Sequence, residues 1–225
     1  MTLRSTLAAA AALTSLALAA PSQAATNLLV NGGFEATSLA PGDYTYPTHG
    51  STVDGWFYFG PAIVDGTGAS AWWPNGPAVV GFEGDNFAAL QTTGVIAQNF
   101  TLTTGTLELS WLDAGRPYSY GCCNGDQTYQ VLLYNYATAS MTTVGQYATF
   151  SGQQFTQQSA TVSGLSGGNY ALVFQGLTAD RDETAFIDNV SAMAVPEPAT
   201  WALTILGFGG VGAMLRRRRV LATAA

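Results

Sequence analysis

The residues of this 225-residue chain that could do chemistry are mostly carboxylates. Between residues 25 and 195, thirteen Asp and Glu side chains stand against two arginines, Arg116 and Arg181, which gives a net charge of −11 in a chain without lysine. Such a surface repels nucleic acid and anionic lipid. It suits divalent cations or neutral ligands that are rich in hydroxyl groups, so we expect no nucleic-acid partner.

Two common catalytic chemistries lack the residues that they need. His49 is the single histidine, which excludes a zinc site built from several histidines. Gly164 to Gly168 matches the Gly-x-Ser-x-Gly nucleophile elbow, but no histidine follows to serve as general base. We expect this segment to be the turn before a strand that begins near Tyr170.

Hydrolysis of a glycoside needs two carboxyl groups held at a defined separation across a cleft. Glu83 with Asp85, or Glu108 with Asp113, could be imagined in that role. Nothing in the sequence places either pair across a cleft. We therefore expect a protein without catalytic activity. A glycoside hydrolase is the weaker alternative.

Cys122 and Cys123 are adjacent, and they are the only cysteines of the chain. Consecutive Cα atoms lie about 3.8 Å apart, below the usual span of a disulfide, so a bond between these two would be strained. Because no third cysteine can pair within the chain, we favour this vicinal disulfide. Pairing between two molecules and two reduced thiols remain the alternatives.

Neutral sugars are bound by flat aromatic faces beside a few polar side chains. Candidates of both kinds gather in two stretches, one around an adjacent tryptophan pair and one around the cysteines. The candidate ligand-binding residues are Trp72, Trp73, Asn75, Arg116, Tyr118, Tyr120, Asn124 and Gln127. The alternative for the tryptophan pair is a core plug beneath a long loop, and we expect one of the two to have that role.

The elements that must position these residues are predicted to be strands. Short runs of alternating apolar residues are separated by Gly-rich turns, as in residues 106–111, where Leu107, Leu109 and Trp111 share a face. Further runs are residues 27–30, 87–91, 95–102, 128–134, 170–175 and 185–190. Eight to ten strands at regular spacing predict an all-β fold of two antiparallel sheets.

Both ends of the chain have the composition of targeting segments. Residues 1–24 combine Arg4, an apolar run and small residues before a cut after Ala24, which predicts a signal peptide for Sec-type export and signal peptidase. Residues 199–215 are apolar and short for a membrane helix, and four arginines follow them. Arginines at this place hold the end of the chain on the cytoplasmic side of a membrane.

The tail VPEPATWALTILGFGGVGAMLRRRR resembles the PEP-CTERM sorting signal. The resemblance implies recognition by an exosortase, cleavage near Pro196, Glu197 and Pro198, transient anchoring in the inner membrane, and delivery to the cell surface or extracellular matrix. The arginine cluster that completes the signal is Arg216, Arg217, Arg218 and Arg219. A plain C-terminal anchor is the alternative.

The middle of the chain resembles the galactose-binding-domain-like jelly roll of many carbohydrate-binding modules. The resemblance rests on residues 27–35, 94–100 and 186–191. It implies that the first and last strands lie side by side, with a structural Ca²⁺ between Glu35 and Asp188 and a further oxygen from Gly33. The alternative is that Glu35 caps a turn and Asp188 accepts backbone hydrogen bonds without a metal.

The sequence therefore predicts four segments: a signal peptide at 1–24 with a helical core, a jelly-roll sandwich at 25–194, a sorting signal with a hydrophobic helix at 195–219, and a tail at 220–225. The predicted function is a non-catalytic exported protein that binds polysaccharide, such as exopolysaccharide. A structural or adhesive matrix protein that binds other proteins is the alternative.

Overall fold

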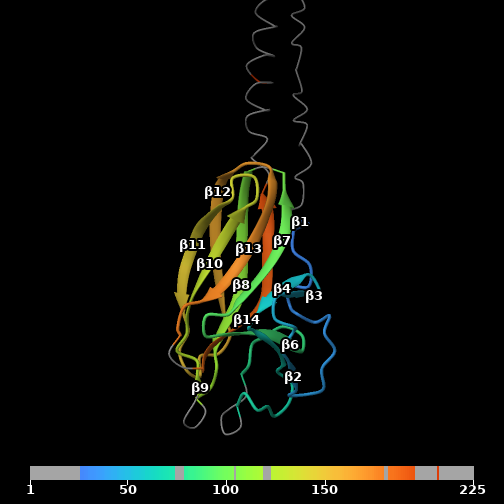
Figure 1. Ribbon diagram of the computed structural model, residues 1–225, viewed down its shortest axis with the longest axis vertical. Helices are drawn as coiled ribbons and strands as arrows, with labels where there is room; N and C mark the ends of the chain where they lie inside the picture. Colours follow the sequence, from blue (N-terminus) through green and yellow to red (C-terminus); the bar gives the residue numbers. More distant parts are fainter. Residues whose placement is uncertain are drawn as a thin grey trace, which may run out of the picture. The chain divides into compact units, whose positions relative to one another are not determined.

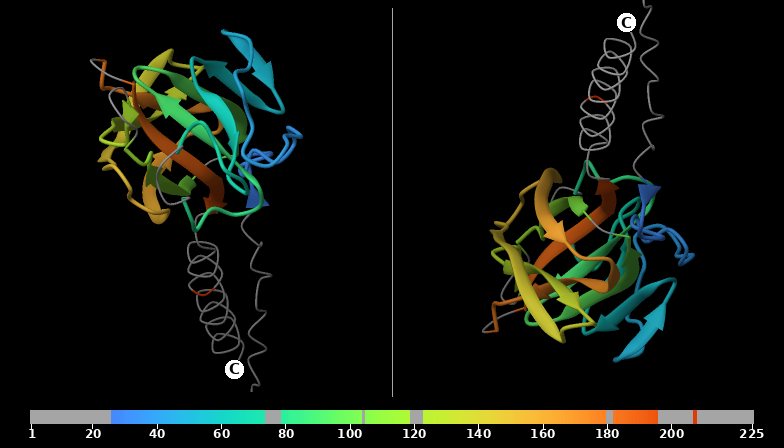
Figure 2. Two further views of the ribbon diagram at one scale, coloured as in Figure 1. Left: turned by 90° about the horizontal axis from the view of Figure 1, so that it is seen from below. Right: turned by 90° about the horizontal axis from the view of Figure 1, so that it is seen from above.

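The computed structural model describes residues 26–73, 79–103, 105–118, 123–179, 182–195 and 207, and its strands form two sheets that pack face to face (Figures 1 and 2). Sheet A contains β1 (Thr26–Asn27), β2 (Tyr44–Thr45), β5 (Ala62–Asp65), β6 (Asn86–Gln91), β8 (Gly105–Gly115), β9 (Cys123–Asn124), β12 (Thr156–Leu165) and β14 (Asp182–Val195). Sheet B contains β3 (Ser51–Val53), β4 (Trp56–Phe59), β7 (Val95–Leu102), β10 (Thr128–Asn135), β11 (Ser140–Ala148) and β13 (Gly168–Gly176).

The last strand organises sheet A. The order across this sheet is β12-β8-β14-β6-β5-β2, and β14 also pairs with β1 and, in parallel, with the short β9. Thr26 pairs with Ala194 and Asn27 with Met193, so the first and last strands lie side by side as the resemblance implied. Sheet B has the order β11-β10-β13-β7-β4-β3.

The main hydrophobic core lies between the sheets and follows from alternation along the strands. Leu107, Leu109 and Trp111 are all 2% exposed or less, so the predicted apolar face of β8 points into this core. From sheet B, Tyr129 and Phe174 meet Trp111 across the layers. Burial of such large aromatic side chains is the main favourable contribution to the stability of the sandwich.

A second hydrophobic cluster covers the opposite face of sheet A. On β14, Ala185 and Ile187 belong to the core between the sheets, whereas Phe186 packs with Trp72, Trp73 and Phe87. Since neighbouring residues of a strand point to opposite faces, both faces of sheet A are covered here. The chain between β5 and β6 provides this cover and thereby fixes Trp72 over the sheet.

The predicted all-β architecture of two antiparallel sheets is confirmed. Several predicted features lie outside the described residues: the signal peptide, Asn75, Tyr120, Cys122, the Pro-Glu-Pro segment and the arginine cluster. The two predicted terminal helices also lie outside them, apart from Gly207. Within the described part of the chain, no helix is long and apolar enough to cross a membrane. Gly164 to Gly168 joins the end of β12 to the start of β13, which confirms the predicted turn.

Candidate ligand pocket and carboxylate cluster

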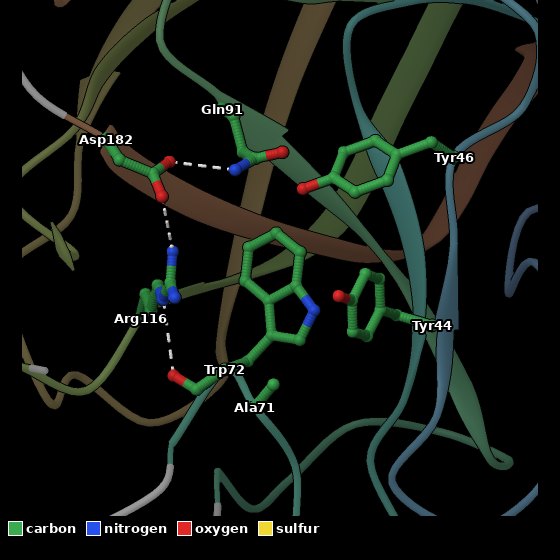
Figure 3. A pocket seen from close by; sticks show the side chains of 7 residues that line it. All are labelled: Tyr44, Tyr46, Ala71, Trp72, Gln91, Arg116 and Asp182. Carbon is green, nitrogen blue, oxygen red and sulfur yellow. Dashed lines mark hydrogen bonds and ion pairs between the residues drawn. The ribbon is translucent and has the colours of Figure 1, made fainter. Parts of the chain in front are cut away.

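A small pocket lies at one end of sheet A, where the ends of the neighbouring strands β6, β8 and β14 meet. Gln91 ends β6, Arg116 follows β8, and Asp182 begins the antiparallel β14, whose Thr184 pairs with Gln91 and whose Ala185 pairs with Gly115. The pocket has a volume of about 80 Å³. We call it the Trp72 pocket. It is lined by Tyr44, Tyr46, Ala71, Trp72, Gln91, Arg116 and Asp182 (Figure 3).

Arg116 and Trp72 form the base of this pocket. The Arg116 Cζ lies 4.4 Å from the centre of the Trp72 ring, in the geometry of a cation–π contact. Arg116 Nε donates to the Trp72 carbonyl oxygen at 3.2 Å. Tyr44 meets the other side of the indole edge-on, with ring centres 5.9 Å apart, and Trp72 is therefore 3% exposed (Figure 3).

A row of hydrogen bonds runs from Arg116 along the rim. Arg116 Nη1 donates to Asp182 Oδ2 at 2.9 Å, and Gln91 Nε2 donates to Asp182 Oδ1 at 2.8 Å. The Tyr46 hydroxyl points toward Gln91 (Figure 3). Burial raises the pKa of Tyr46, the Gln91 hydrogen bond lowers it, and the Asp182 charge raises it further, so this phenol stays neutral and can donate.

Two tyrosines present ring surface to solvent at the mouth of the pocket. Tyr44 is 41% and Tyr46 52% exposed, and their ring centres lie 5.8 Å apart with the planes nearly perpendicular. Aromatic surface of this kind binds the C–H face of a sugar ring, while carboxylate, amide and guanidinium groups bind its hydroxyls. Asp182 compensates the charge of Arg116, so the pair gives the pocket no net charge.

Of the residues predicted to bind a ligand, the structure brings Trp72 and Arg116 into the pocket. Both tryptophans are buried in the second cluster, so the core role expected of one of them applies to both. Trp73 also donates from Nε1 to the Gly68 carbonyl oxygen. Tyr118 is 65% exposed but does not line the pocket. Asn124 is buried, and its side-chain oxygen accepts from the amide of Asp126.

The prediction of Gln127 as a ligand-binding residue is corrected by its burial. Its side chain is fully buried, and Nε2 donates to the carbonyl oxygens of Thr92 and Glu183. Its Oε1 accepts from the Thr178 amide. Every one of these bonds joins segments of the sandwich, so Gln127 has a structural role.

Cys123 is disulfide-bonded and occupies β9 beside the start of β14. Cys122 is the only other cysteine of the chain and lies outside the described residues. The vicinal bond therefore stays a prediction. The parallel pairing of Cys123 with Asp182 anchors the cysteine segment next to the Trp72 pocket.

The carboxylates predicted to hold calcium lie in one region, around Gly33. A Cβ on Gly33 would be 3.7 Å from Asp188 Oδ1 and 3.7 Å from Glu35 Cγ. Glu35 Oε1 accepts from the amides of Asp85 and Asn86, both at 2.9 Å. Asp188 is fully buried, and its two oxygens accept from the amides of Glu83 and Asn189.

Within the described part of the chain, no cationic side chain contributes to the electrostatics of the Asp188 carboxyl group in this cluster. Burial raises the pKa of Asp188 to about 7; the amides of Glu83 and Asn189 lower it, and the charges of Glu35 and Glu83 raise it. In the described part of the chain, which has no lysine, Arg116 is the only arginine, and it is paired with Asp182.

Two further features of the cluster fit a bound cation. The buried Asn86 Oδ1 has no hydrogen-bond partner. Phe34 and Asn189, the residues next to Glu35 and Asp188, have φ angles of 60° and 45°, a strained conformation that concentrates at binding sites. Among the described residues no three Asp, Glu, His or Cys side chains converge as metal ligands, so amide and backbone oxygens would have to complete the coordination.

Of the two carboxylate pairs considered for glycoside hydrolysis, Glu108 and Asp113 do not share a face of their sheet. Glu108 and Asp113 lie on β8, but Glu108 is exposed on the outer face whereas Asp113 is 1% exposed on the core side. They point to opposite sides of the sheet because successive residues of a strand alternate between its faces and these two are an odd number of positions apart. In the Trp72 pocket, Asp182 is the one carboxylate among the described lining residues, so the pair required for that reaction is missing there.

A larger hollow of about 270 Å³ lies on the outer face of sheet A. It is lined by Glu108, Leu109, Ser110, Ser159, Ala160, Thr161 and Met193. No aromatic ring contributes to it. The Trp72 pocket is therefore the stronger candidate for sugar binding, since it combines exposed rings with fixed polar groups.

Comparison with known proteins identifies the C-terminal segment. Residues 194–219 match the PEP-CTERM protein-sorting motif, as the resemblance of the tail indicated. No curated protein matches the chain.

Solved structures similar to the chain include carbohydrate-binding modules. The module TmCBM61, solved with β-1,4-galactotriose, has 13% identity and a TM-score of 0.46, over 74% of this chain and 97% of the module. The family 22 xylan-binding module from Paenibacillus barcinonensis has 11% identity and a TM-score of 0.43, over 71% and 99%. An adhesin domain of Lys-gingipain from Porphyromonas gingivalis has 12% identity and a TM-score of 0.44, over 76% and 99%.

Proposed function

We propose that this protein is an exported, envelope-sorted β-sandwich that binds a neutral polysaccharide through the Trp72 pocket without catalysing a reaction. The observation that carries the proposal is the exposed Tyr44 and Tyr46 pair beside the fixed row of Gln91, Asp182 and Arg116. Aromatic rings beside hydroxyl-binding groups can bind one sugar ring of a polysaccharide, either at its end or in a side branch.

The charge of the protein supports a neutral ligand. The −11 charge of residues 25–195 repels anionic polymers, and the single described arginine is already paired. The same charge is compatible with chains that carry hydroxyl groups alone. Because no second carboxylate stands in the described part of the pocket, the proposed role is binding rather than cleavage.

The route to the envelope is supported by the sorting motif at residues 194–219. In the proposed sequence of events, a Sec-type system exports the chain, signal peptidase removes the first segment, and an exosortase cleaves near Pro196, Glu197 and Pro198. The mature protein is then released to the cell surface or extracellular matrix, where exopolysaccharide is the proposed ligand.

A structural Ca²⁺ held in the carboxylate cluster is part of the proposal. Glu35 and Asp188 would supply carboxylate oxygens, and Asn86 Oδ1 and the Gly33 carbonyl are the neutral candidates. The ion would supply positive charge to a buried group beside which the described residues place no cationic side chain. Its role would be to join the first turn to the last strand rather than to take part in chemistry.

Affinity electrophoresis of the full chain in detergent, on gels containing β-1,4-galactan, xylan and other neutral polysaccharides, tests the binding. We expect retardation by at least one polymer and about 3- to 10-fold weaker binding for Tyr46→Ala, because one exposed ring is removed. Tyr136→Ala is the matched control, since Tyr136 is 50% exposed but lies after β10 in the other sheet.

Three results would contradict the proposal. The first is no retardation on any polymer, and the second is equal binding by Tyr46→Ala and the unaltered protein. The third is release of reducing ends from a retained polymer, which would show that the protein is a hydrolase.

A further inference from the structure

The two sheets end in very different strands on their two sides. One side of the sandwich ends in β12, with 10 residues, and β11, with 9. The opposite side ends in β2, with 2 residues, and β3, with 3. Figure 1 shows β11 and β12 on the same side, and the two strands are in contact. The sandwich therefore has one long lateral edge and one that is almost absent.

The part of β12 from Thr156 to Val162 lacks the features that usually protect a sheet edge. Such edges are protected by charged residues, proline or bulges, because their unpaired N–H and C=O groups recruit other strands. Residues 156–165 include no charged residue and no proline. In the described part of the chain β12 pairs with β8 alone, in unbroken register from Thr156 to Val162. The register of this pairing shifts only beyond Val162, before Leu165, whereas the pairing of β11 with β10 shifts near its middle, between Val131 and Leu132.

The edge strand is also held in place from inside the protein. Thr156 Oγ1 donates to Asp113 Oδ1 at 3.0 Å, and Gln158 Nε2 donates to the same oxygen at 3.1 Å. The second oxygen of this buried carboxylate accepts from the Tyr129 hydroxyl at 2.7 Å. A strand fixed in this way loses little conformational entropy when it pairs with a partner.

We propose that β12 pairs antiparallel with β12 of a second copy of this chain, which joins two copies of sheet A into one continuous sheet. Two molecules of net charge −11 repel each other over most of their surface. The β12 edge has no charged residue of its own, and Glu108, the carboxylate on the outer face beside it, lies on β8, one strand away. Ser159 and Thr161 are exposed on that outer face, and small hydroxyl side chains pair well across antiparallel strands.

The second copy fits better than another partner because the pairing is self-complementary. Two identical strands that run antiparallel satisfy the same set of backbone groups on each other, and a two-fold axis closes the assembly. The other end of sheet A offers a strand of 2 residues, which is too short for a head-to-tail contact. The proposal does not depend on any ligand of the Trp72 pocket.

Sedimentation of the full chain in density-matched detergent, over a range of protein concentrations, tests this pairing. We expect a dimer for the unaltered chain and for Thr143→Lys, a control on the neighbouring β11 edge. Ser159→Lys and Ser159→Glu should each sediment as a monomer, because like charges then face each other across the two-fold axis. An equimolar mixture of Ser159→Lys and Ser159→Glu should recover the dimer.

Recovery in the mixture also shows that both variants are folded. A monomeric unaltered chain at every concentration would overturn the proposal, as would a dimer of Ser159→Lys as stable as the original. Equal loss of dimer in Thr143→Lys and Ser159→Lys would overturn the assignment to β12. Failure of the mixture to dimerise while both variants keep the near-ultraviolet circular dichroism of the original would overturn the antiparallel pairing.

Discussion

At the scale of single residues, Arg116 connects the parts of the Trp72 pocket. One guanidinium covers the Trp72 ring, donates to the Trp72 carbonyl oxygen and forms an ion pair with Asp182. These contacts need a planar group with several donors in fixed directions. Lysine carries the same charge as a single compact ammonium group, so it is not an equivalent residue here.

We therefore expect Arg116→Lys to lower the free energy of unfolding of the full chain by about 1–2 kcal/mol, because one hydrogen bond and the stacked contact are lost. Arg116→Met should cost more, since Asp182 then keeps Gln91 alone as a partner, although solvent reaches part of that carboxylate. Denaturant titration measures both. Glu108→Gln, a change at an exposed carboxylate, is the control, and an Arg116→Lys protein as stable as the original would contradict the assigned role.

The sequence revealed Trp72 and Arg116 as pocket residues because their types are rare in this chain. It did not reveal Tyr44, Tyr46 or Gln91, which belong to short strands or strand ends that carry no distinctive motif. Asp182 belongs to an acidic run at residues 180–183 that includes Arg181, so an ion pair within the run is the simplest interpretation of the sequence. The structure instead pairs Asp182 with Arg116, 66 positions earlier in the sequence, because β8 and β14 are neighbours in sheet A.

At the scale of elements, the turn after β1 is fixed by a close approach to β14. The Gly32 carbonyl oxygen accepts from the Val190 amide at 2.9 Å. A Cβ at Gly32 would lie 2.0 Å from the Val190 carbonyl oxygen, which is a backbone atom and cannot move aside alone. At the next residue, Gly33, a Cβ would meet side-chain atoms at 3.7 Å, which is ordinary contact.

These neighbouring glycines give a matched pair of variants. Gly32→Ala should lower the free energy of unfolding by about 1–3 kcal/mol, because the turn must move away from β14. Gly33→Ala should change it by about 1 kcal/mol or less, because the new methyl group has room. Thermal and denaturant unfolding of both full-length variants measure the difference, and equal stabilities would show that the turn is not fixed in this way.

The long strands could be predicted from the sequence, and several short ones could not. Alternation in residues 106–111 identified the centre of β8, and runs of apolar residues identified β7, β10 and β13. The strands from β2 to β5 are 2 to 4 residues long, below the length at which a period of two can be recognised. β12 was missed because both its faces are largely polar, as expected for the edge of a sheet.

At the scale of the whole molecule, Asp188 lies where the first turn, the segment before β6 and the last strand meet. Its protonation should therefore affect unfolding of the entire sandwich. An unfolded aspartate titrates near pH ~4, whereas folding raises the pKa of Asp188 to about 7. Between these values the folded state binds the extra proton, so the contribution of Asp188 to stability decreases as the pH rises toward 7 and is constant above it.

In a chelating buffer we expect the unfolding temperature of the full chain to include a contribution from Asp188 that falls as the pH rises from about 4 to about 7. With saturating Ca²⁺ the decrease should become smaller or reverse, because the ion binds the ionised carboxylate. Calorimetry at a series of pH values in both buffers makes the comparison. Identical profiles with and without calcium would contradict the proposed ion.

The unequal lateral edges of the sandwich set the number of contacts that one molecule can make. Pairing through β12 leaves sheet A with a free edge of only 2 residues, so sheet A grows no further than two copies. Each pair would carry two Trp72 pockets. Such a molecule acts as a bivalent cross-linker, whose avidity for a polymer with many repeats exceeds the affinity of either pocket alone. In a secreted matrix it would join polysaccharide chains and stiffen the gel.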